Sequence, residues 1–254
     1  MPGILVALRT RCGAVPVFFT LLLCSVGYAH GRCGAEAKLL VSPTHPQQAL
    51  ASLDAGKPSR GQVYLYDTDQ LDLLSQGLIV RLRTGPKGDL TIKLRSLKEE
   101  PCTCPSEVRE TANCEADLVG SATLTSYSVR KAWKGAAIPE TGRELHSALS
   151  ADQLKVLRAA GVSVDWPHLK RKVEIQANDW EARPPGPLKK VSIELWEWPG
   201  GRILELSAKA DLRDGTAALR ELRALAERYG LSVPENQVTK TNLVLHARPV
   251  SHVE

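Results

Sequence analysis

The run YLYDTDQLDLLSQGLIVRLRTGPKGDLTIKLR, residues 64–95, carries the clearest structural signal in this sequence. Its second half has two arms of alternating apolar and polar residues, 78–83 (LIVRLR) and 90–95 (LTIKLR), joined by the turn residues TGPKG. Two such arms on either side of a Gly/Pro turn predict an antiparallel β-hairpin. Successive side chains of a strand point to opposite faces. One face of the hairpin is therefore apolar, and the other carries four cations and a threonine: Arg81, Arg83, Thr91, Lys93 and Arg95.

The basic face of this hairpin admits two interpretations. Alternation is typical of a strand whose polar side meets water, so the face could be ordinary protein surface. Clustered arginine and lysine also form charge-assisted hydrogen bonds with phosphate, so the face could equally bind a polyanion.

A short helix is predicted just before the hairpin. Asp67, Thr68 and Asp69 are residues that cap helix starts, and Gly77 suits the end of a helix whose apolar residues are Leu71 and Leu74. This pattern favours a structural role for the Asp-Thr pair over a catalytic one.

Ionisable residues also alternate along the other predicted strands, 36–41, 62–66, 115–118, 170–176, the hairpin 190–209 and 238–246. Charges repeated across a whole sheet predict a closed antiparallel barrel with a polar interior, because closure removes the sheet edges. Two helices, one beginning at Ser150 and one running from Asp214 to Gly230, would cover its apolar outside, which gives an α+β fold.

Cations inside such a barrel need partners, because an unpaired buried charge is very costly. The basic residues that this prediction places inside are Arg81, Arg83, Lys93, Arg95, Lys170, Lys172 and Lys209. The carboxylates available to them are Glu36, Glu115, Asp117, Glu174, Glu194 and Glu205. A bound polyphosphate with a divalent cation would complete the balance.

The first 29 residues have the pattern of a secretory signal peptide. Arg9 and Arg11 precede an apolar run at 14–24, and small residues end it at Ala29. The run is short for a membrane span, although an uncleaved anchor remains the alternative. Cleavage would lower the formal net charge from +5 to +3 and leave residues 30–254, enough for one domain in the periplasm or medium. Such a mild positive charge argues against a general nucleic-acid binder.

Four cysteines would remain after cleavage: Cys33, Cys102, Cys104 and Cys114. An exported protein can oxidise them, and four cysteines allow three pairings. We expect a bridge from the loop at 102–104 to Cys114, which would close a short surface loop. Zinc is the weaker alternative, because the sequence has no Cys-x-x-Cys pair with suitable partners.

Several short motifs, taken in order, resemble the CYTH or triphosphate tunnel metalloenzyme superfamily. They are Tyr66-Asp67-Thr68, the leucines before Gly77, Val80-Arg81-Leu82-Arg83, Thr91-Ile92-Lys93, the run 203–209 (ILELSAK) and Thr239-Lys240-Thr241. The resemblance implies a single eight-stranded tunnel domain over 30–254 that binds a triphosphate-bearing molecule or polyphosphate. It implies phosphate ligands at Lys38, Arg81, Arg83, Lys93, Lys209 and Lys240. It also implies Mg²⁺ or Mn²⁺ at Glu36 and Glu205, with Glu115 or Glu194 as further ligands, and catalytic roles for Glu36 and Glu205.

One position departs from the family pattern. The superfamily opens with Glu-x-Glu-x-Lys, whereas this chain reads Gly34-Ala35-Glu36-Ala37-Lys38. Three functions therefore stay open: an exported phosphohydrolase, an anion-binding protein without turnover, and a structural envelope protein. The sequence contains no phosphate-binding P-loop and no Gly-x-Ser-x-Gly elbow, so P-loop and serine-hydrolase chemistry find no support.

Overall fold

The computed structural model describes residues 33–42, 46, 50, 51, 53–135 and 137–247. The predicted signal peptide, residues 1–29, lies outside them. Among the helices in these ranges, none combines the length and the apolar character that a membrane crossing requires.

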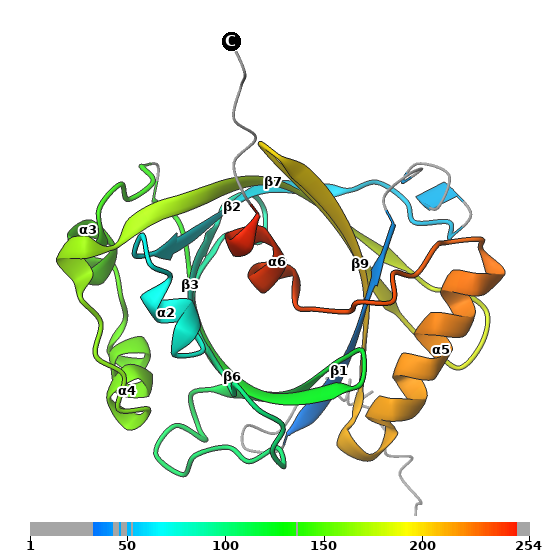
Figure 1. Cartoon of the computed structure of the whole chain (residues 1–254), viewed down its shortest axis with the longest axis horizontal. Helices are drawn as coiled ribbons and strands as arrows, with labels where there is room; N and C mark the ends of the chain where they lie inside the picture. Colours follow the sequence, from blue (N-terminus) through cyan, green and yellow to red (C-terminus); the bar gives the residue numbers. More distant parts are fainter. Residues whose placement is uncertain (1–32, 43–45, 47–49, 52, 136, 248–254) are drawn as a thin grey trace, which may run out of the picture.

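Nine strands in the described part of the chain close into one barrel (Figure 1). Their order around the barrel is β1-β5-β6-β4-β3-β2-β7-β8-β9. Their bounds are β1 Gly34–Val41, β2 Ser59–Asp67, β3 Leu78–Arg83, β4 Asp89–Arg95, β5 Asn113–Val119, β6 Ala122–Ala132, β7 Lys170–Ala182, β8 Val191–Trp198 and β9 Gly201–Asp211. The prediction of a closed barrel is confirmed.

The predicted strand number and the all-antiparallel pairing are wrong. β1 pairs with β5 in parallel, with Glu36 opposite Asp117, so the sheet is mixed. The loop between β4 and β5 carries the chain back along the barrel, and this is why β5 runs in the direction of β1. Such a non-local pairing leaves no trace in the alternation of either strand.

The hairpin at residues 78–95 forms as β3 and β4, with Arg81 opposite Thr91. Its apolar side chains are buried on the outside of the barrel, in a cluster that includes Val80, Leu82 and Ile92. The helix α4 (Ala151–Ala159) contributes Val156 and Leu157 to the same cluster. Burial against the helix therefore fixes which face of the hairpin is left for the interior.

The remaining helices are α2 (Asp72–Ser75), α3 (Gly142–Ser147), α5 (Gly215–Arg228) and α6 (Lys240–His246), with two 3₁₀ turns at Trp166–His168 and Leu212–Asp214. The helix α5 packs Leu222, Leu225 and Ala226 against apolar residues of β1 and β9. The two helices expected over the outer face are thus confirmed.

The Asp-Thr pair before α2 has the structural role that the sequence predicts. The Asp67 carboxylate is buried and accepts hydrogen bonds from the backbone N–H groups of Thr68, Leu73 and Leu74. The Thr68 hydroxyl accepts one from the Asp72 N–H.

The strand predicted at 238–246 is wrong, because residues 240–246 form the helix α6. Thr239 caps this helix by accepting a hydrogen bond from the Asn242 N–H. Figure 1 shows α6 inside the ring of strands. Its Val244 packs on an interior apolar cluster that includes Leu40, Leu65 and Ile79. The barrel supplies an apolar lining for one turn of helix, and this tertiary contact overrides the weak local alternation.

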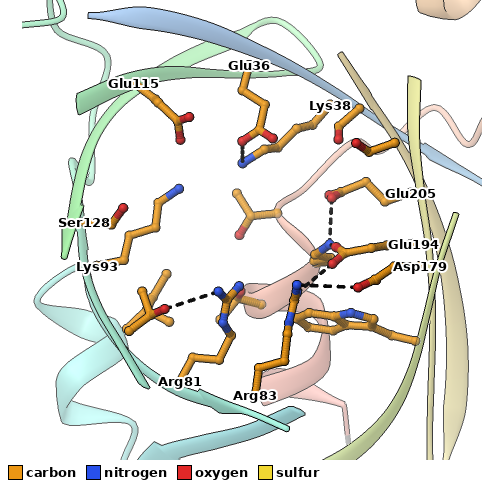
Figure 2. Close-up of a pocket in the computed structure, with 18 of the residues that line it drawn as sticks. Glu36, Lys38, Arg81, Arg83, Lys93, Glu115, Ser128, Asp179, Glu194 and Glu205 are labelled. Carbon is orange, nitrogen blue, oxygen red and sulfur yellow. Dashed lines mark hydrogen bonds and ion pairs between the residues drawn. The ribbon is translucent and has the colours of Figure 1, made fainter. Parts of the chain in front are cut away.

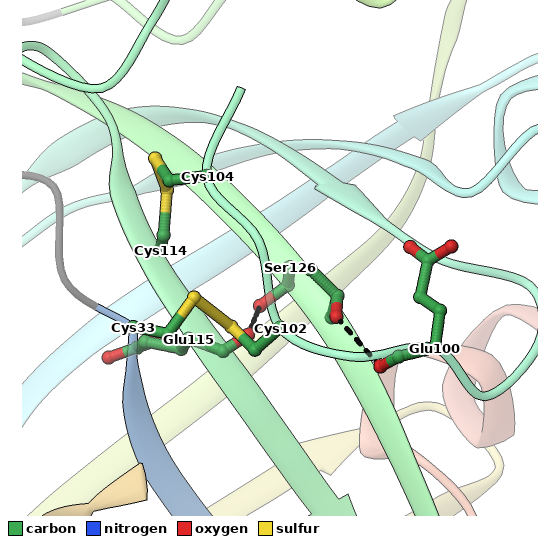
Figure 3. The surroundings of a disulfide bond; sticks show 8 residues. Cys33, Glu100, Cys102, Cys104, Cys114, Glu115 and Ser126 are labelled. Carbon is green, nitrogen blue, oxygen red and sulfur yellow. Dashed lines mark hydrogen bonds between the residues drawn. A yellow bond between two sulfur atoms is a disulfide. The ribbon is translucent and has the colours of Figure 1, made fainter. Parts of the chain in front are cut away.

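Two disulfides, Cys33–Cys102 and Cys104–Cys114, tie the β4–β5 loop to the starts of β1 and β5 (Figure 3). The expected bridge from the loop to Cys114 is confirmed. Cys114 directly precedes Glu115, so the disulfides hold the ends of the two strands that carry Glu36 and Glu115.

Candidate anion and metal site inside the barrel

The inward faces of the strands line a cavity of about 270 Å³ (Figure 2). All ten residues predicted for the site line it: Glu36, Lys38, Arg81, Arg83, Lys93, Glu115, Glu194, Glu205, Lys209 and Lys240. The cavity is also lined by Arg95, Arg130 and Asp179, and by the indole of Trp196. Lys240 reaches the cavity from the helix α6, although the sequence had implied that it lies on a strand.

The prediction that Lys170, Lys172 and Glu174 join the interior charges is wrong. Lys170 and Lys172 both bond the Asp69 carboxylate on the outside, and Glu174 accepts a hydrogen bond from Gln62 in an exposed position. The opposite face of β7 points inward instead. Alternation separates two faces of a strand, but it does not say which of them faces a cavity.

Asp117 is the most densely paired carboxylate of the site. Its side chain has no solvent exposure. The oxygen Oδ1 lies 2.8 Å from Lys38 Nζ, and Oδ2 lies 2.8 Å from Lys93 Nζ and 2.9 Å from Arg95 Nη2. Burial disfavours the charge, but Lys38 and Lys93 outweigh it and hold the pKa of Asp117 well below its usual value. The sequence suggested Asp117 only as one of several counter-charges, although it lies on the same face of its strand as Glu115.

Asp117 is also part of a cluster of three carboxylates, which forms where β1 and β5 run side by side. Oxygens of Glu36, Glu115 and Asp117 lie within 4.8 Å of one another. Glu36 bonds Lys38 at 3.0 Å, and Glu115 bonds Lys209. Glu194 and Glu205 are not part of this cluster. Both of them bond Lys240 instead.

Gly34, at the position where the family has its first glutamate, lies directly opposite Glu115 in the parallel β1–β5 pair. A Cβ at Gly34 would touch only the Ala210 carbonyl oxygen, at 3.8 Å, so crowding does not explain the glycine. Glu115 therefore supplies a carboxylate next to Gly34, the position at which the CYTH pattern Glu-x-Glu-x-Lys has its first glutamate.

The opposite wall carries a second set of ion pairs. Arg83 bonds Glu194 at 2.6 Å and Asp179 at 3.5 Å. Lys240 bonds Glu194 and, at 2.8 Å, Glu205, and it lies over the Trp196 ring. Asp179 was not predicted from the sequence, because the predicted strand ended at residue 176. The strand β7 continues to Ala182, and this continuation places Asp179 in the cavity wall.

Arg81 and Arg83 have unused hydrogen-bonding capacity. Arg81 contacts Asp89 at 3.3 Å and Thr91 at 3.3 Å. The Nε atoms of both arginines are buried and have no hydrogen-bond partner, and the same is true of Asp179 Oδ1. Buried N–H groups normally find an acceptor, so each of these two arginines, which line the cavity, keeps one unused hydrogen-bond donor.

Burial and neighbouring charges separate the pKa values of the two glutamates predicted as catalytic. Burial would raise the pKa of Glu36, but Lys38, Lys93 and Lys209 together outweigh it and lower that pKa to about 2. Burial raises the pKa of Glu205 to about 7. Glu36 is therefore ionised at neutral pH, as a metal ligand must be, whereas Glu205 can exchange a proton there.

The Lys93 ammonium should make anion binding depend on pH. Burial, and then the Lys38 charge, lower the pKa of Lys93 to about 8, so its charge is lost as pH rises above that value. We expect affinity for tripolyphosphate to fall between pH 7 and pH 9 more steeply in the wild type than in Lys93→Arg, measured by calorimetry. Parallel profiles of affinity against pH for the two proteins would contradict this role of Lys93. The protonation of the ligand itself is the same for both proteins at each pH, so it cannot cause a difference between them.

The carboxylate group of Glu36, Glu115 and Asp117 fits a hard divalent cation. Mg²⁺ and Mn²⁺ take oxygen ligands, and one or two carboxylates with substrate phosphates are a common Mg²⁺ arrangement. Glu36 and Glu115 are the better donors of the three, because three cations already engage Asp117.

Two solved structures share this fold over most of the chain. One is a "putative adenylate cyclase" from Bacillus halodurans, with a TM-score of 0.56 and 15% identity over 84% of this chain and 98% of that one. The other is a "putative adenylyl cyclase" from Hippeastrum, with a TM-score of 0.56 and 16% identity over 84% of this chain and 99% of that one. The structure of the second is described as revealing a dominant triphosphatase activity. No protein-family model and no curated protein matches this sequence. The barrel is nevertheless a CYTH-like fold, as the motifs predicted.

Proposed function

We propose that this protein binds a triphosphate-bearing molecule or polyphosphate inside the barrel, together with Mg²⁺ or Mn²⁺, and hydrolyses it. The observation that carries the proposal is the convergence of six basic residues, from four strands and α6, on one cavity beside the Glu36–Glu115 pair. The triphosphatase activity described for the Hippeastrum protein of the same fold supports the choice of substrate class.

The internal ion pairs explain how such a cavity can exist without ligand and still accept one. Lys38, Lys93 and Lys209 each bond a carboxylate of the β1–β5 wall. Glu36 and Glu115 would hold a divalent cation, and Lys38 and Lys209, which bond them in this structure, would then be free to bond phosphate oxygens. The charge of the ligand then replaces the charge that the carboxylates contributed, so no cation is left buried and unpaired.

Each group then has a distinct part in hydrolysis. Arg81 and Arg83 would orient the phosphate chain through their free Nε groups. A cation on Glu36 and Glu115 would polarise a phosphoryl oxygen and lower the pKa of a bound water. Glu205, with its pKa near neutrality, would accept the proton of the attacking water.

Metal-dependent phosphate release tests this proposal directly. We expect purified protein to release phosphate from tripolyphosphate with Mn²⁺ and not with EDTA. Replacing Glu36 and Glu115 together by glutamine should abolish that release, because both proposed metal donors lose their charge. Glu174→Gln, which changes a carboxylate on the outer face, is the matched control and should keep full activity. Activity that survives in the Glu36/Glu115 variant would rule out this metal site.

Binding without turnover is the second candidate, and Gly34 favours it, because the first glutamate of the family motif is absent. In that case tripolyphosphate would raise the Tm of the protein, since a ligand stabilises the state that binds it. No phosphate release would accompany the shift with either metal. A structural protein without a ligand would show neither effect.

We also propose that the protein is exported by a signal peptide cleaved after Ala29. Its two disulfides support this, because such bonds persist in oxidising compartments. Expression of the full sequence in a secreting host should give a mature chain that begins at His30, with both disulfides formed. N-terminal sequencing and thiol titration measure these outcomes. A chain that keeps residue 1 and titrates four or more free thiols would contradict export.

A further inference from the structure

Two disulfide bonds in tandem join the start of β1 to the start of β5 (Figure 3). Cys33 directly precedes β1 and bonds Cys102, while Cys114 is the second residue of β5 and bonds Cys104. In the loop, Thr103 alone separates the two bonded cysteines. The two bonds and residues 102–104 therefore form one short covalent connection between the strands, which we call the disulfide clip. The proposed chemistry assigns it no part.

The disulfide clip lies beside the two carboxylates proposed to hold the divalent cation. Glu115 directly follows Cys114, and Glu36 is the third residue of β1. Oxygens of these two side chains lie within 4.8 Å of each other. Two donors on one strand would keep their spacing through the backbone of that strand, but Glu36 and Glu115 come from two strands. The distance between them therefore depends on how closely the starts of β1 and β5 are held together.

Backbone pairing alone holds the two strand starts weakly. On their other sides, β1 pairs with β9 over eight residues and β5 pairs with β6 over seven, whereas β1 and β5 pair over five. The first of these five pairs, Gly34 with Glu115, is at the end of the ladder, and the ends of elements open most easily. Glu36, Glu115 and Asp117 gather at this point, and their like charges repel one another. The clip opposes this separation.

The two bonds of the clip differ in their access to a reductant. Cys104 and Cys114 are only 8% and 4% exposed, whereas Cys33 and Cys102 are half-buried. Thiol–disulfide exchange requires access to a sulfur atom, so a dithiol reductant reaches the Cys33–Cys102 bond first. One thiolate of the dithiol attacks this bond and forms a mixed disulfide, and its second thiol displaces the remaining cysteine. The products are two cysteine thiols and the reductant in its disulfide form, a transfer of two electrons and two protons.

We propose that the disulfide clip positions Glu36 and Glu115 for the divalent cation, so that metal affinity depends on the oxidation of the Cys33–Cys102 bond. The inference rests on the proposed function, because it concerns the cation proposed there. Reduction by a dithiol opens the clip and lets the starts of β1 and β5 move apart, and reoxidation restores the site. Arg81 and Arg83 lie on β3, away from this seam, so phosphate binding depends on the clip much less.

Titration of the mature protein with Mn²⁺, followed by electron paramagnetic resonance, tests the proposal. We expect Cys33→Ser/Cys102→Ser to bind Mn²⁺ about 10- to 100-fold more weakly than the oxidised wild type, the usual cost of losing the groups that orient metal ligands. Dithiothreitol should produce the same loss in the wild type, and reoxidation should reverse it. It should cause no further loss in Cys33→Ser/Cys102→Ser, which controls for metal bound by the reductant. Tripolyphosphate affinity in EDTA should stay within threefold throughout.

Gly34→Glu distinguishes positioning of the donors from a general loss of stability. A Cβ at this position meets only the Ala210 carbonyl oxygen, at 3.8 Å, and residues 34 and 36 face the same side of β1. The variant therefore places two donors on one strand, which β9 holds along its whole length. Its Mn²⁺ affinity should change less than threefold when the Cys33–Cys102 bond is reduced. A clip that only stabilised the fold would lose affinity in both backgrounds, and that result would overturn the proposal.

The outcomes also separate this inference from the function on which it rests. If the oxidised wild type binds no Mn²⁺, the proposed metal site fails and the inference fails with it. If the wild type binds Mn²⁺ and Cys33→Ser/Cys102→Ser binds it within threefold, the clip does not position the donors and the proposed function stands. Should this variant fail to fold, stepwise reduction of the folded wild type decides. Loss of Mn²⁺ affinity at unchanged tripolyphosphate affinity supports the proposal, and parallel loss of both contradicts it.

Discussion

Replacing Asp117 by asparagine is expected to destabilise the protein by about 3–5 kcal/mol, the cost of removing one partner from a buried ion pair. The carboxylate has no solvent exposure and contacts Lys38, Lys93 and Arg95 at 2.8–2.9 Å. Asparagine has nearly the same shape, so packing is conserved and the change is electrostatic. The three cations would be left close together in a site of low dielectric constant, where they repel one another.

Denaturant unfolding of the wild type and Asp117→Asn measures this loss. Asp69→Asn is the matched control, because Asp69 also bonds two lysines, Lys170 and Lys172, but in an exposed position. Exposed pairs are screened by water and contribute little, so the control should stay close to wild type. Tripolyphosphate should restore more stability to Asp117→Asn than to the wild type, because the anion replaces the missing charge. Similar losses in the two variants, or no rescue by tripolyphosphate, would contradict the role of Asp117.

The interior face of the hairpin could be predicted because its signal is local. Alternation in 78–83 and 90–95 divides each arm into an apolar and a basic face, and the Gly/Pro turn pairs them. The apolar side of both arms is uniform enough to require burial, and α4 covers it. Only the basic side remains for the cavity, so Arg81, Arg83 and Lys93 were assigned to it correctly.

The same reasoning fails where neither face of a strand is clearly apolar. Along β7, Lys170, Lys172 and Glu174 alternate with Arg171, Val173 and Ile175, and both faces carry charge at the start of the strand. The barrel turns the Ile175 face inward to meet Val244 of α6. That choice depends on a helix 70 residues later in the sequence, so no window around β7 contains the information.

The arrangement around Asp117 is also non-local. Its partners come from two strands, Lys38 from β1 and Lys93 and Arg95 from β4. The parallel β1–β5 pair and the order β5–β6–β4 place these strands on opposite sides of β5, which carries Asp117. Sequence patterns identify which residues face inward, but only the strand order determines which of them meet. The helical position of Lys240 has the same origin, since α6 is stabilised by the lining of the finished barrel.

The double replacement Arg81→Ala/Lys93→Ala is expected to weaken tripolyphosphate binding by about 10²- to 10⁴-fold. Each residue would give the ligand at least one charge-assisted hydrogen bond, worth about 1.5–3 kcal/mol. The fold should survive, because Asp117 keeps Lys38 and Arg95 as partners after Lys93 is removed. Arg81 is held by two long contacts, 3.3 Å to Asp89 and 3.3 Å to Thr91, and its Nε has no partner, so its removal breaks little that the empty barrel needs.

The matched control is Lys170→Ala/Lys172→Ala, which changes the net charge by the same amount on the outer face of β7. If the long-range field of the protein dominated binding, both double variants would lose affinity equally, and the loss would disappear in high salt. Direct contact in a buried cavity predicts instead a large loss for the inner pair alone, which persists when salt is raised. Calorimetric titration at two salt concentrations distinguishes the two cases. An inner variant that binds tripolyphosphate within threefold of wild type would contradict direct contact between the phosphate and these two residues, both of which line the cavity.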